Sequence, residues 1–137
     1  MMRSRLAATI AAAVVTLVSL PLQAATVRIL QTNSAGDNIH IIDPGTNKVV
    51  GIVTGIEVNH GATATPDGKW YFFSNEADHT LDAVDTKTLK VTKKIALSGR
   101  PNNITVSKNG QHVYVSIVSG SGAVDVIDTA TLNRVKS

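Results

Sequence analysis

Short apolar runs separated by polar turns recur from residue 27 onward, and they predict β-strands. Asp-Gly at 67–68 and Asn-Gly at 109–110 each precede an apolar run that ends in serine. Because such pairs tolerate positive φ angles, we predict a two-residue type I′ hairpin at each. In chain order, the predicted strands are 29–33, 38–43, 48–54, 61–65, 70–74, 81–85, 91–97, 103–107, 112–117, 124–128 and 133–136.

The pattern is periodic. Asp43, Asp85 and Asp128 each close a strand run, at intervals of 42 and 43 residues, and we expect their carboxylates to accept hydrogen bonds from turn N–H groups. Such a period, dense in short strands, is typical of β-propeller blades of about 40 to 45 residues. The runs YFF and VYVSIV are nearly continuous, as expected of strands that neighbouring sheets cover on both faces.

We therefore predict an all-β fold, a partial β-propeller of two to three four-stranded antiparallel blades. The blades are expected at approximately 27–58, 59–100 and 101–137, and the first of them lacks its first strand. Eleven strands are fewer than a closed ring of about four to eight blades needs, so apolar faces are expected at both ends of the stack. We expect a fragment of a longer propeller, a chain that assembles with copies of itself or with a partner, or a poorly stable remnant.

Residues 1–24 have the features of a secretory signal peptide, expected to be helical. Arg3 and Arg5 precede an almost wholly apolar segment from Leu6 to Leu20, and small residues follow at 24 and 25. An uncleaved membrane anchor is the alternative, although the apolar run is shorter than the roughly 20 residues that a spanning helix needs. The leader predicts export to a bacterial periplasm or cell surface, with no membrane span after cleavage.

Charge and cysteine content exclude several classes of function. Two of the 13 basic residues lie in the leader, so 11 basic residues face 10 acidic ones in the rest of the chain. This near balance gives no reason to expect a nucleic-acid partner. The absence of cysteine excludes disulfides, thiolate metal sites and c-type haem attachment, so packing alone must hold the chain together.

The chain resembles the YVTN-repeat β-propellers of bacterial and archaeal surface and periplasmic proteins. The matching segments are DNIHIIDPGTNKVV at 37–50, HGATATPDGKWYFFSN at 60–75, HVYVS at 112–116 and AVDVIDTATLNRV at 123–135. The resemblance implies a blade of a closed ring, often a seven-bladed one, and related rings carry haem, quinone-linked or lactone-hydrolysing chemistry. It indicates the fold much more specifically than the function.

The loops at one end of the blades are where chemistry is expected. In the related WD-repeat blades, a histidine at the entrance to the first strand bonds a serine or threonine of the second strand and an aspartate of the next turn, which implies a structural network of His60, Ser74 and Asp78. The alternative is a metal or haem site, with His60, Glu76 and His79 as candidate ligands. The next repeat has Asn102, Ser116 and Gly120 at the network positions, so neither arrangement recurs.

These features favour an exported, non-catalytic binding or interaction scaffold with no cofactor. Its partner is expected to be another protein or further propeller blades. The alternative is part of an enzymatic or redox propeller, with His60, Glu76 and His79 at its site and a metal or haem as its cofactor.

Overall fold

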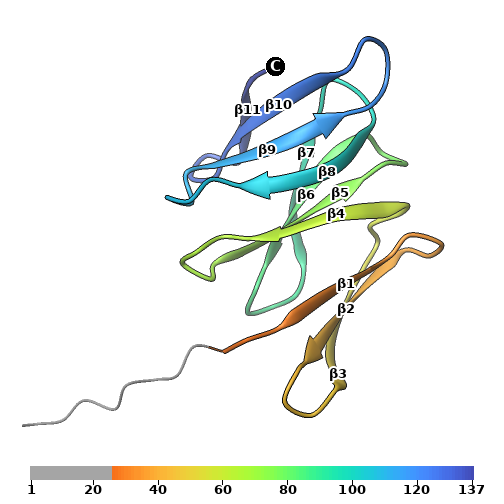
Figure 1. The fold of residues 1–137 in the computed structure, drawn as a ribbon, viewed down its shortest axis with the longest axis vertical. Helices are drawn as coiled ribbons and strands as arrows, with labels where there is room; N and C mark the ends of the chain where they lie inside the picture. Colours follow the sequence, from red (N-terminus) through yellow and green to blue (C-terminus); the bar gives the residue numbers. More distant parts are fainter. Residues whose placement is uncertain (1–25) are drawn as a thin grey trace, which may run out of the picture.

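The computed structural model describes residues 26–137, which form eleven strands and no helix (Figure 1). The predicted signal peptide lies outside these residues. Three antiparallel sheets stand side by side along the long axis. Sheet A contains, in spatial order, β1 (Ile29–Asn33), β2 (Asn38–Asp43) and β3 (Lys48–Thr54). Sheet B contains β4 (Asn59–Ala64), β5 (Trp70–Asn75), β6 (Thr80–Asp85) and β7 (Val91–Ala96). Sheet C contains β8 (Pro101–Val106), β9 (His112–Ile117), β10 (Ala123–Asp128) and β11 (Asn133–Lys136).

The all-β prediction is confirmed, and β1, β2, β3, β9 and β11 agree with their predicted ranges at both ends. The first strands of sheets B and C begin two residues earlier than predicted, at Asn59 and Pro101. Each contains a register shift, between Asn59 and Ala62 in β4 and between Pro101 and Ile104 in β8. The strands therefore continue across an irregularity that breaks the sequence alternation. Within the described residues, no helix is long and apolar enough to span a membrane.

The predicted type I′ hairpins are wrong. Only the glycine of each pair has a positive φ, 70° at Gly68 and 73° at Gly110. Thr65 N donates to Trp70 O at 3.0 Å, and Gly68 N donates to Thr65 O at 2.9 Å, so residues 66–69 form a four-residue loop around a β-turn. A proline at 66 fits the second position of a type I turn, and the Asp67 carboxylate then accepts a hydrogen bond from Lys69 N at 3.0 Å.

The three periodic aspartates behave as predicted. The Oδ1 atom of Asp85 accepts hydrogen bonds from the backbone N–H groups of Lys87 at 3.0 Å and Thr88 at 2.8 Å. Asp43 and Asp128 make the equivalent pairs of bonds. These bonds lower the pKa of Asp85 and Asp128. The largest contribution is the bond from the backbone N–H of Thr88 at Asp85 and of Thr131 at Asp128. They fix the turn between the third and fourth strands of each repeat.

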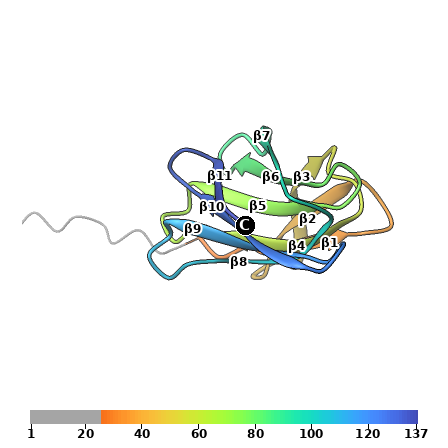
Figure 2. The same cartoon turned by 90° about the horizontal axis from the view of Figure 1, so that it is seen from above.

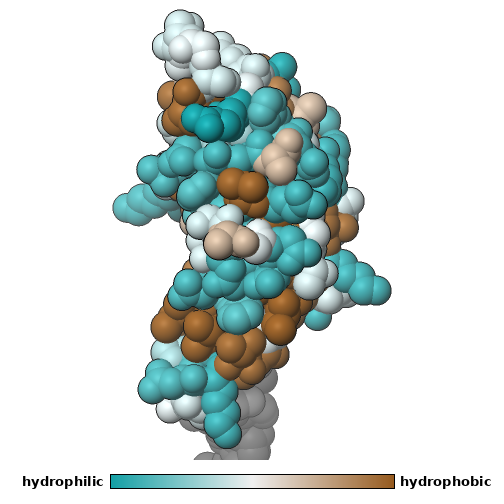
Figure 3. Space-filling model, turned by 90° about the vertical axis from the view of Figure 1, so that its right-hand side faces the viewer, coloured by the Kyte–Doolittle hydropathy of each residue, from teal (hydrophilic) through white to brown (hydrophobic). Residues whose placement is uncertain are grey.

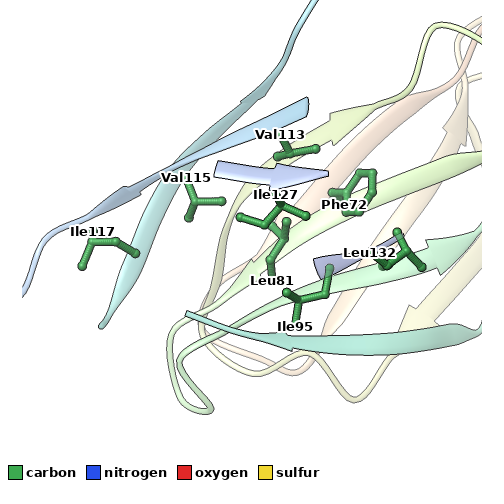
Figure 4. Close-up of a cluster of buried hydrophobic side chains, with 9 residues drawn as sticks. Phe72, Leu81, Ile95, Val113, Val115, Ile117, Ile127 and Leu132 are labelled. Carbon is green, nitrogen blue, oxygen red and sulfur yellow. The ribbon is translucent and has the colours of Figure 1, made fainter. Parts of the chain in front are cut away.

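Two apolar clusters join the three sheets. The A–B junction buries Ile39, Ile41, Val53, Ile56, Phe73 and Val84. The B–C junction buries Phe72, Leu81, Ala83, Ile95, Val113, Val115, Ile117, Ile127 and Leu132 (Figure 4). Sheet B contributes to both clusters because successive residues of a strand point to opposite faces. The adjacent residues Phe72 and Phe73 of β5 are both fully buried, one in each junction.

The first strands β4 and β8 lie against each other, on one side of the molecule, and the last strands β3 and β7 lie on the opposite side (Figure 2). Gly61 permits the close approach of β4 and β8. A Cβ atom at this glycine would lie 2.6 Å from Asn102 O and 2.9 Å from Ile104 N, both backbone atoms. In sheet A, β1 takes the place that β5 has in sheet B, and the position of a strand equivalent to β4, 42 residues earlier, lies outside the described residues, so the predicted lack of a first strand stays a prediction.

The outward faces of sheets A and C remain open to solvent. Ile29, Val49 and Ile52 of sheet A and Tyr114 and Val124 of sheet C are all more than a third exposed. Figure 3 shows hydrophobic surface gathered at the sheet A end of the molecule, below a mostly hydrophilic middle. The exposure of equivalent residues depends on whether a neighbouring sheet covers them. Phe72 in the middle sheet is fully buried, whereas Tyr114, 42 residues later in sheet C, is 40% exposed.

Candidate functional site

Polar side chains from sheets B and C meet at one end of the strands, around Glu76. This residue directly follows β5 and starts the turn to β6. His60 is the second residue of β4, and Asn102 is the second residue of β8. Arg100 ends the link from β7 to β8. Because β4 and β8 run side by side, the sheets bring these four residues together although 42 residues separate the outermost two.

Glu76 is at the centre of this cluster. Its Oε1 atom accepts a hydrogen bond from Asn102 Nδ2 at 3.0 Å and lies 3.3 Å from His60 Nε2. Its Oε2 atom lies 3.9 Å from a guanidinium nitrogen of Arg100. The carboxylate side chain is only 10% exposed, whereas those of His60 and Arg100 are 40% and 54% exposed. A nearly buried anion is thus surrounded by donors whose outer parts reach solvent, which satisfies the need of a buried charge for partners.

The backbone beside this cluster has two unusual features. Val58 has a φ of 47°, a left-handed conformation that a β-branched residue rarely adopts, and its carbonyl accepts a hydrogen bond from Glu76 N at 3.4 Å. Asn59 is fully buried, and its Oδ1 is the one buried side-chain N or O atom of residues 26–137 that has no hydrogen-bond partner. Backbone strain and unpaired buried polar atoms concentrate at functional sites, so both features favour this end of the molecule.

The predicted hydrogen bonds that would join His60 to Ser74 and to Asp78 do not form. Ser74 Oγ accepts a hydrogen bond from Gly61 N at 2.7 Å, so it bonds the backbone next to the histidine. The Asp78 carboxylate lies 2.6 Å from Lys94 Nζ and accepts a bond from Asn75 Nδ2 at 3.2 Å. The bond from Lys94 is the main reason that the pKa of Asp78 is lowered and that of Lys94 is raised. The three residues each bond other groups.

The candidate metal ligands are only partly brought together. His60 and Glu76 are neighbours, but His79 is exposed on the turn, has a φ of 55°, and uses its carbonyl to accept a bond from Leu97 N at 3.1 Å. In the part of the chain that the structure describes, no group of three or more His, Asp or Glu side chains is arranged to hold a metal ion.

Sequence reasoning placed His60 and Glu76 at this site but missed Arg100 and Asn102 as their partners. Both missed residues belong to the following repeat, and only the side-by-side packing of β4 and β8 brings them to Glu76. A signal was available, since Asn102 lies 42 residues after His60 at the same place in the repeat. Polar residues at equivalent positions near the start of the first strand in neighbouring repeats therefore predict a contact between the two sheets.

The cluster can bind an anion or a hydrogen-bond acceptor. A guanidinium has five N–H donors, and Arg100 uses little of this capacity on Glu76. If His60 donates Nε2–H to Glu76, its Nδ1 atom accepts a hydrogen bond when the ring is neutral and donates one to an anion only when the ring carries both protons. Sheet A also borders this surface, because Thr32 Oγ1 donates to His60 O at 3.2 Å. The site thus has contributions from all three sheets.

No protein family matches this sequence, and no curated protein does. Solved structures do match. The chain is similar to Kuenenia stuttgartiensis hydrazine synthase (27% identity, TM-score 0.76) over 80% of this chain and 31% of that one. It is also similar to the dihydro-heme d1 dehydrogenase NirN in complex with DHE (23% identity, TM-score 0.68), over 88% of this chain and 26% of that one. A third match is apo AztD from Citrobacter koseri (17% identity, TM-score 0.62), over 76% and 29%.

These three neighbours are β-propeller proteins. The three sheets of this chain are propeller blades. Sheets A, B and C can accordingly be called blades A, B and C, with β4 and β8 as the inner strands of blades B and C. The chain spans about a quarter to a third of the length of the neighbours it matches. The cluster around Glu76 lies at the inner ends of blades B and C, where β4 and β8 begin.

Proposed function

We propose that this protein is a non-catalytic β-propeller binding module, and that it binds an anionic group of its ligand at Arg100, with His60 beside it. The observation that carries this proposal is Glu76, a nearly buried carboxylate that is shared by donors from two blades. It holds His60 and Arg100 at one place while leaving about half of each side chain open to solvent. An arginine held in this way suits the recognition of carboxylate or phosphate groups.

Titration with small anions followed by NMR tests this function. Sodium glutarate and sodium phosphate serve as probes at constant ionic strength, and the His60 ring resonances are the readout. We expect saturable shifts in the native protein. Arg100→Gln should weaken binding at least about tenfold, a loss of roughly 1.4 kcal/mol. Glu76→Gln should weaken it less, because the donors remain but are no longer held together.

Lys108→Gln is the matched control, since it removes the same charge from an exposed hairpin residue at the other end of β8. Its affinity for both probes should equal that of the native protein. Shifts that do not saturate, or that are the same in Arg100→Gln as in the native protein, would contradict the proposal. Because the probes differ in geometry, their relative affinities also distinguish a carboxylate ligand from a phosphate ligand.

A redox role is the second candidate, because two of the neighbours are named as a hydrazine synthase and a dihydro-heme d1 dehydrogenase. In the cavity between blades A and B, about 730 Å³, Tyr71 is the one lining residue of a type that serves as an axial haem ligand, and no histidine or methionine lines it. An absorption band of haem, or a stoichiometric metal, in the purified protein would support the redox role against the binding module.

We also propose that the protein acts outside the cytoplasm, in the periplasm or at the cell surface. The support is the leader sequence, with Arg3 and Arg5 before an apolar segment that ends at Leu20. Cell fractionation after expression of the full chain tests this location. The protein should be recovered in the periplasmic or surface fraction with its leader removed, and recovery of the uncleaved chain in the cytoplasm would contradict it.

A further inference from the structure

The two outward faces of the stack are both largely apolar and uncharged at their centres. Face A is the outward side of sheet A, and its central residues are Ile29, Gln31, His40, Ile42, Val49 and Ile52. Face C is the outward side of sheet C, and its central residues are Thr105, Tyr114, Ser116, Val124 and Val126. Ile52 on face A is 52% exposed, and Val124 on face C is 55% exposed. Exposed apolar surfaces of this kind mark interaction sites.

The residues of face C are the repeat equivalents of residues that already receive a neighbouring blade. In the second strands, Leu30, Phe72 and Tyr114 occupy one position, because each lies beside the same residue of its third strand: Ile41, Ala83 and Val126. Leu30 packs into the A–B junction and Phe72 into the B–C junction. Tyr114 has the same place in blade C, where no further blade of the described residues covers it: it is 40% exposed, and the aromatic ring beside it is that of His112 in its own strand.

The residues of face A are the repeat equivalents of the residues with which blade B packs on blade A and blade C packs on blade B. Ile42, Val84 and Ile127 occupy one position of the third strand, where each lies beside its second-strand partner. Val84 packs on blade A and Ile127 packs on blade B. Ile42 has that place in blade A, and no blade of residues 26–137 packs on it. The described residues therefore carry one uncovered copy of each half of a junction that they form twice internally.

We propose that the protein associates head to tail with a second copy of itself, so that face A of one copy covers face C of the other. The internal A–B and B–C junctions show that surfaces of these two kinds fit together. Face C also has a hollow of about 260 Å³, lined by Ile104, Tyr114 and Val124 among others, which offers a concave seat for apolar side chains. An interface between two different faces is heterologous, so copies close into a ring or extend into a filament.

Two single substitutions on different faces test this arrangement. Ile52→Glu places a charge on face A only, and Tyr114→Glu places one on face C only. Both sites are exposed, so the folded monomer should tolerate them, which circular dichroism checks. The proteins are purified after expression of the full chain, and their masses are followed by sedimentation velocity up to high micromolar concentration. The native protein should form oligomers, and each variant alone should be monomeric.

The mixture of the two variants is the decisive sample. Tyr114→Glu retains an intact face A and Ile52→Glu retains an intact face C, so equal amounts should form a dimer and nothing larger. Ser34→Glu, at an exposed turn position, is the control and should assemble like the native protein. A native protein that stays monomeric at high concentration would overturn the proposal and leave the faces to a different partner. Folded variants whose mixture stays monomeric would overturn it too.

Discussion

Trp70 at the B–C junction and Arg28 at the A–B junction lie 42 residues apart at equivalent places, each beside an aspartate that closes the third strand. Trp70 packs against the B–C cluster. Arg28 instead pairs with Asp43 at 3.2 Å and lines a cavity of about 730 Å³. The same repeat position thus fills one junction with an aromatic ring and leaves a cavity in the other.

Buried acids show the same difference. Asp82 faces the A–B junction and Asp125 faces the B–C junction, at equivalent positions and both fully buried. Burial raises the pKa of Asp82, and the hydrogen bonds from Thr80 and Asn75, with Lys94 3.9 Å away, do not outweigh it. Burial also acts on Asp125, but hydrogen bonds from Ser98 N at 2.7 Å and Ser98 Oγ at 2.8 Å, with Arg134 nearby, outweigh it and lower its pKa. The comparison indicates that B–C is the stronger junction.

Truncating the two buried phenylalanines should have the largest effect. Phe72→Ala removes a fully buried ring from the B–C cluster, and Phe73→Ala removes one from the A–B cluster. Each should lower the free energy of unfolding by about 3 to 5 kcal/mol, and we expect Phe72→Ala to lie at the upper end of that range. Urea unfolding measures both values. A larger loss from Phe73→Ala would reverse the proposed order of the junctions.

Gly61→Ala should have the next largest effect. Its new Cβ atom would meet the backbone of β8, which cannot move aside as a flexible side chain would. We expect a loss of about 3 kcal/mol, at the upper end of overpacking effects. Gly36→Ala is the control, because the nearest atom to its Cβ would lie at 3.6 Å, an ordinary contact. Equal stability of the two variants in thermal unfolding would show that blades B and C do not approach as closely as described.

Replacing the two buried aspartates by asparagine should have unequal effects. Asp125→Asn should lower the free energy of unfolding by about 2 kcal/mol at pH 7, since it weakens charge-assisted hydrogen bonds between blades B and C. Asp82→Asn should lower it by less, because burial already disfavours the charge there. Unfolding titrations at pH 7 compare them, and an equal or greater loss at Asp82 would contradict the assigned difference.

The contributions of Asp125 and Asp82 to the free energy of unfolding should change with pH in opposite directions. The lowered pKa of Asp125 means that its contribution is present above pH 3.8, the ordinary value, and is lost as the pH falls below it. The raised pKa of Asp82 means that the folded state binds its proton first, so this group favours folding as the pH falls toward 3.8. As the pH is lowered from 7 to 3.8, the contribution of Asp82 to the free energy of unfolding should increase. The Asp125→Asn protein should show this increase, and the Asp82→Asn protein should not.

Arg28→Trp should have the smallest effect, a gain in stability. Trp70 fills the equivalent place at the B–C junction, so a tryptophan at 28 should reduce the A–B cavity and stabilise the protein by about 1 kcal/mol. Part of the gain is offset by loss of the Asp43 partner. The midpoint of thermal unfolding measures the difference, and Arg28→Gln, which removes the charge without filling the space, is the control. A loss of stability in Arg28→Trp but not in Arg28→Gln would mean that the cavity does not admit the ring.

Local chemistry made the strands predictable, whereas contacts between blades were not. Runs such as WYFFS, bounded by a Pro-Asp-Gly turn, define β5 from the sequence alone, and the Asp85 turn follows from the same rules. Both I′ turns failed because four-residue loops form, with Pro66 in one and Lys108 in the other, and in each the hydroxyl of Thr65 or Ser107 accepts a bond from the backbone N–H five residues later. The bond between Asn102 and Glu76 depends on how β4 lies against β8, and no local pattern encodes that distance.

Site-resolved amide hydrogen exchange tests most directly the central claim that blades are stabilised by their neighbours. It should be measured on Tyr114→Glu, whose face C cannot dock. We predict that the amides of β5 and β6 in blade B, which is covered on both faces, exchange more slowly than those of blades A and C. Amides of β9 and β10 in blade C, or of β2 in blade A, that exchange as slowly as those of β5 and β6 would contradict it.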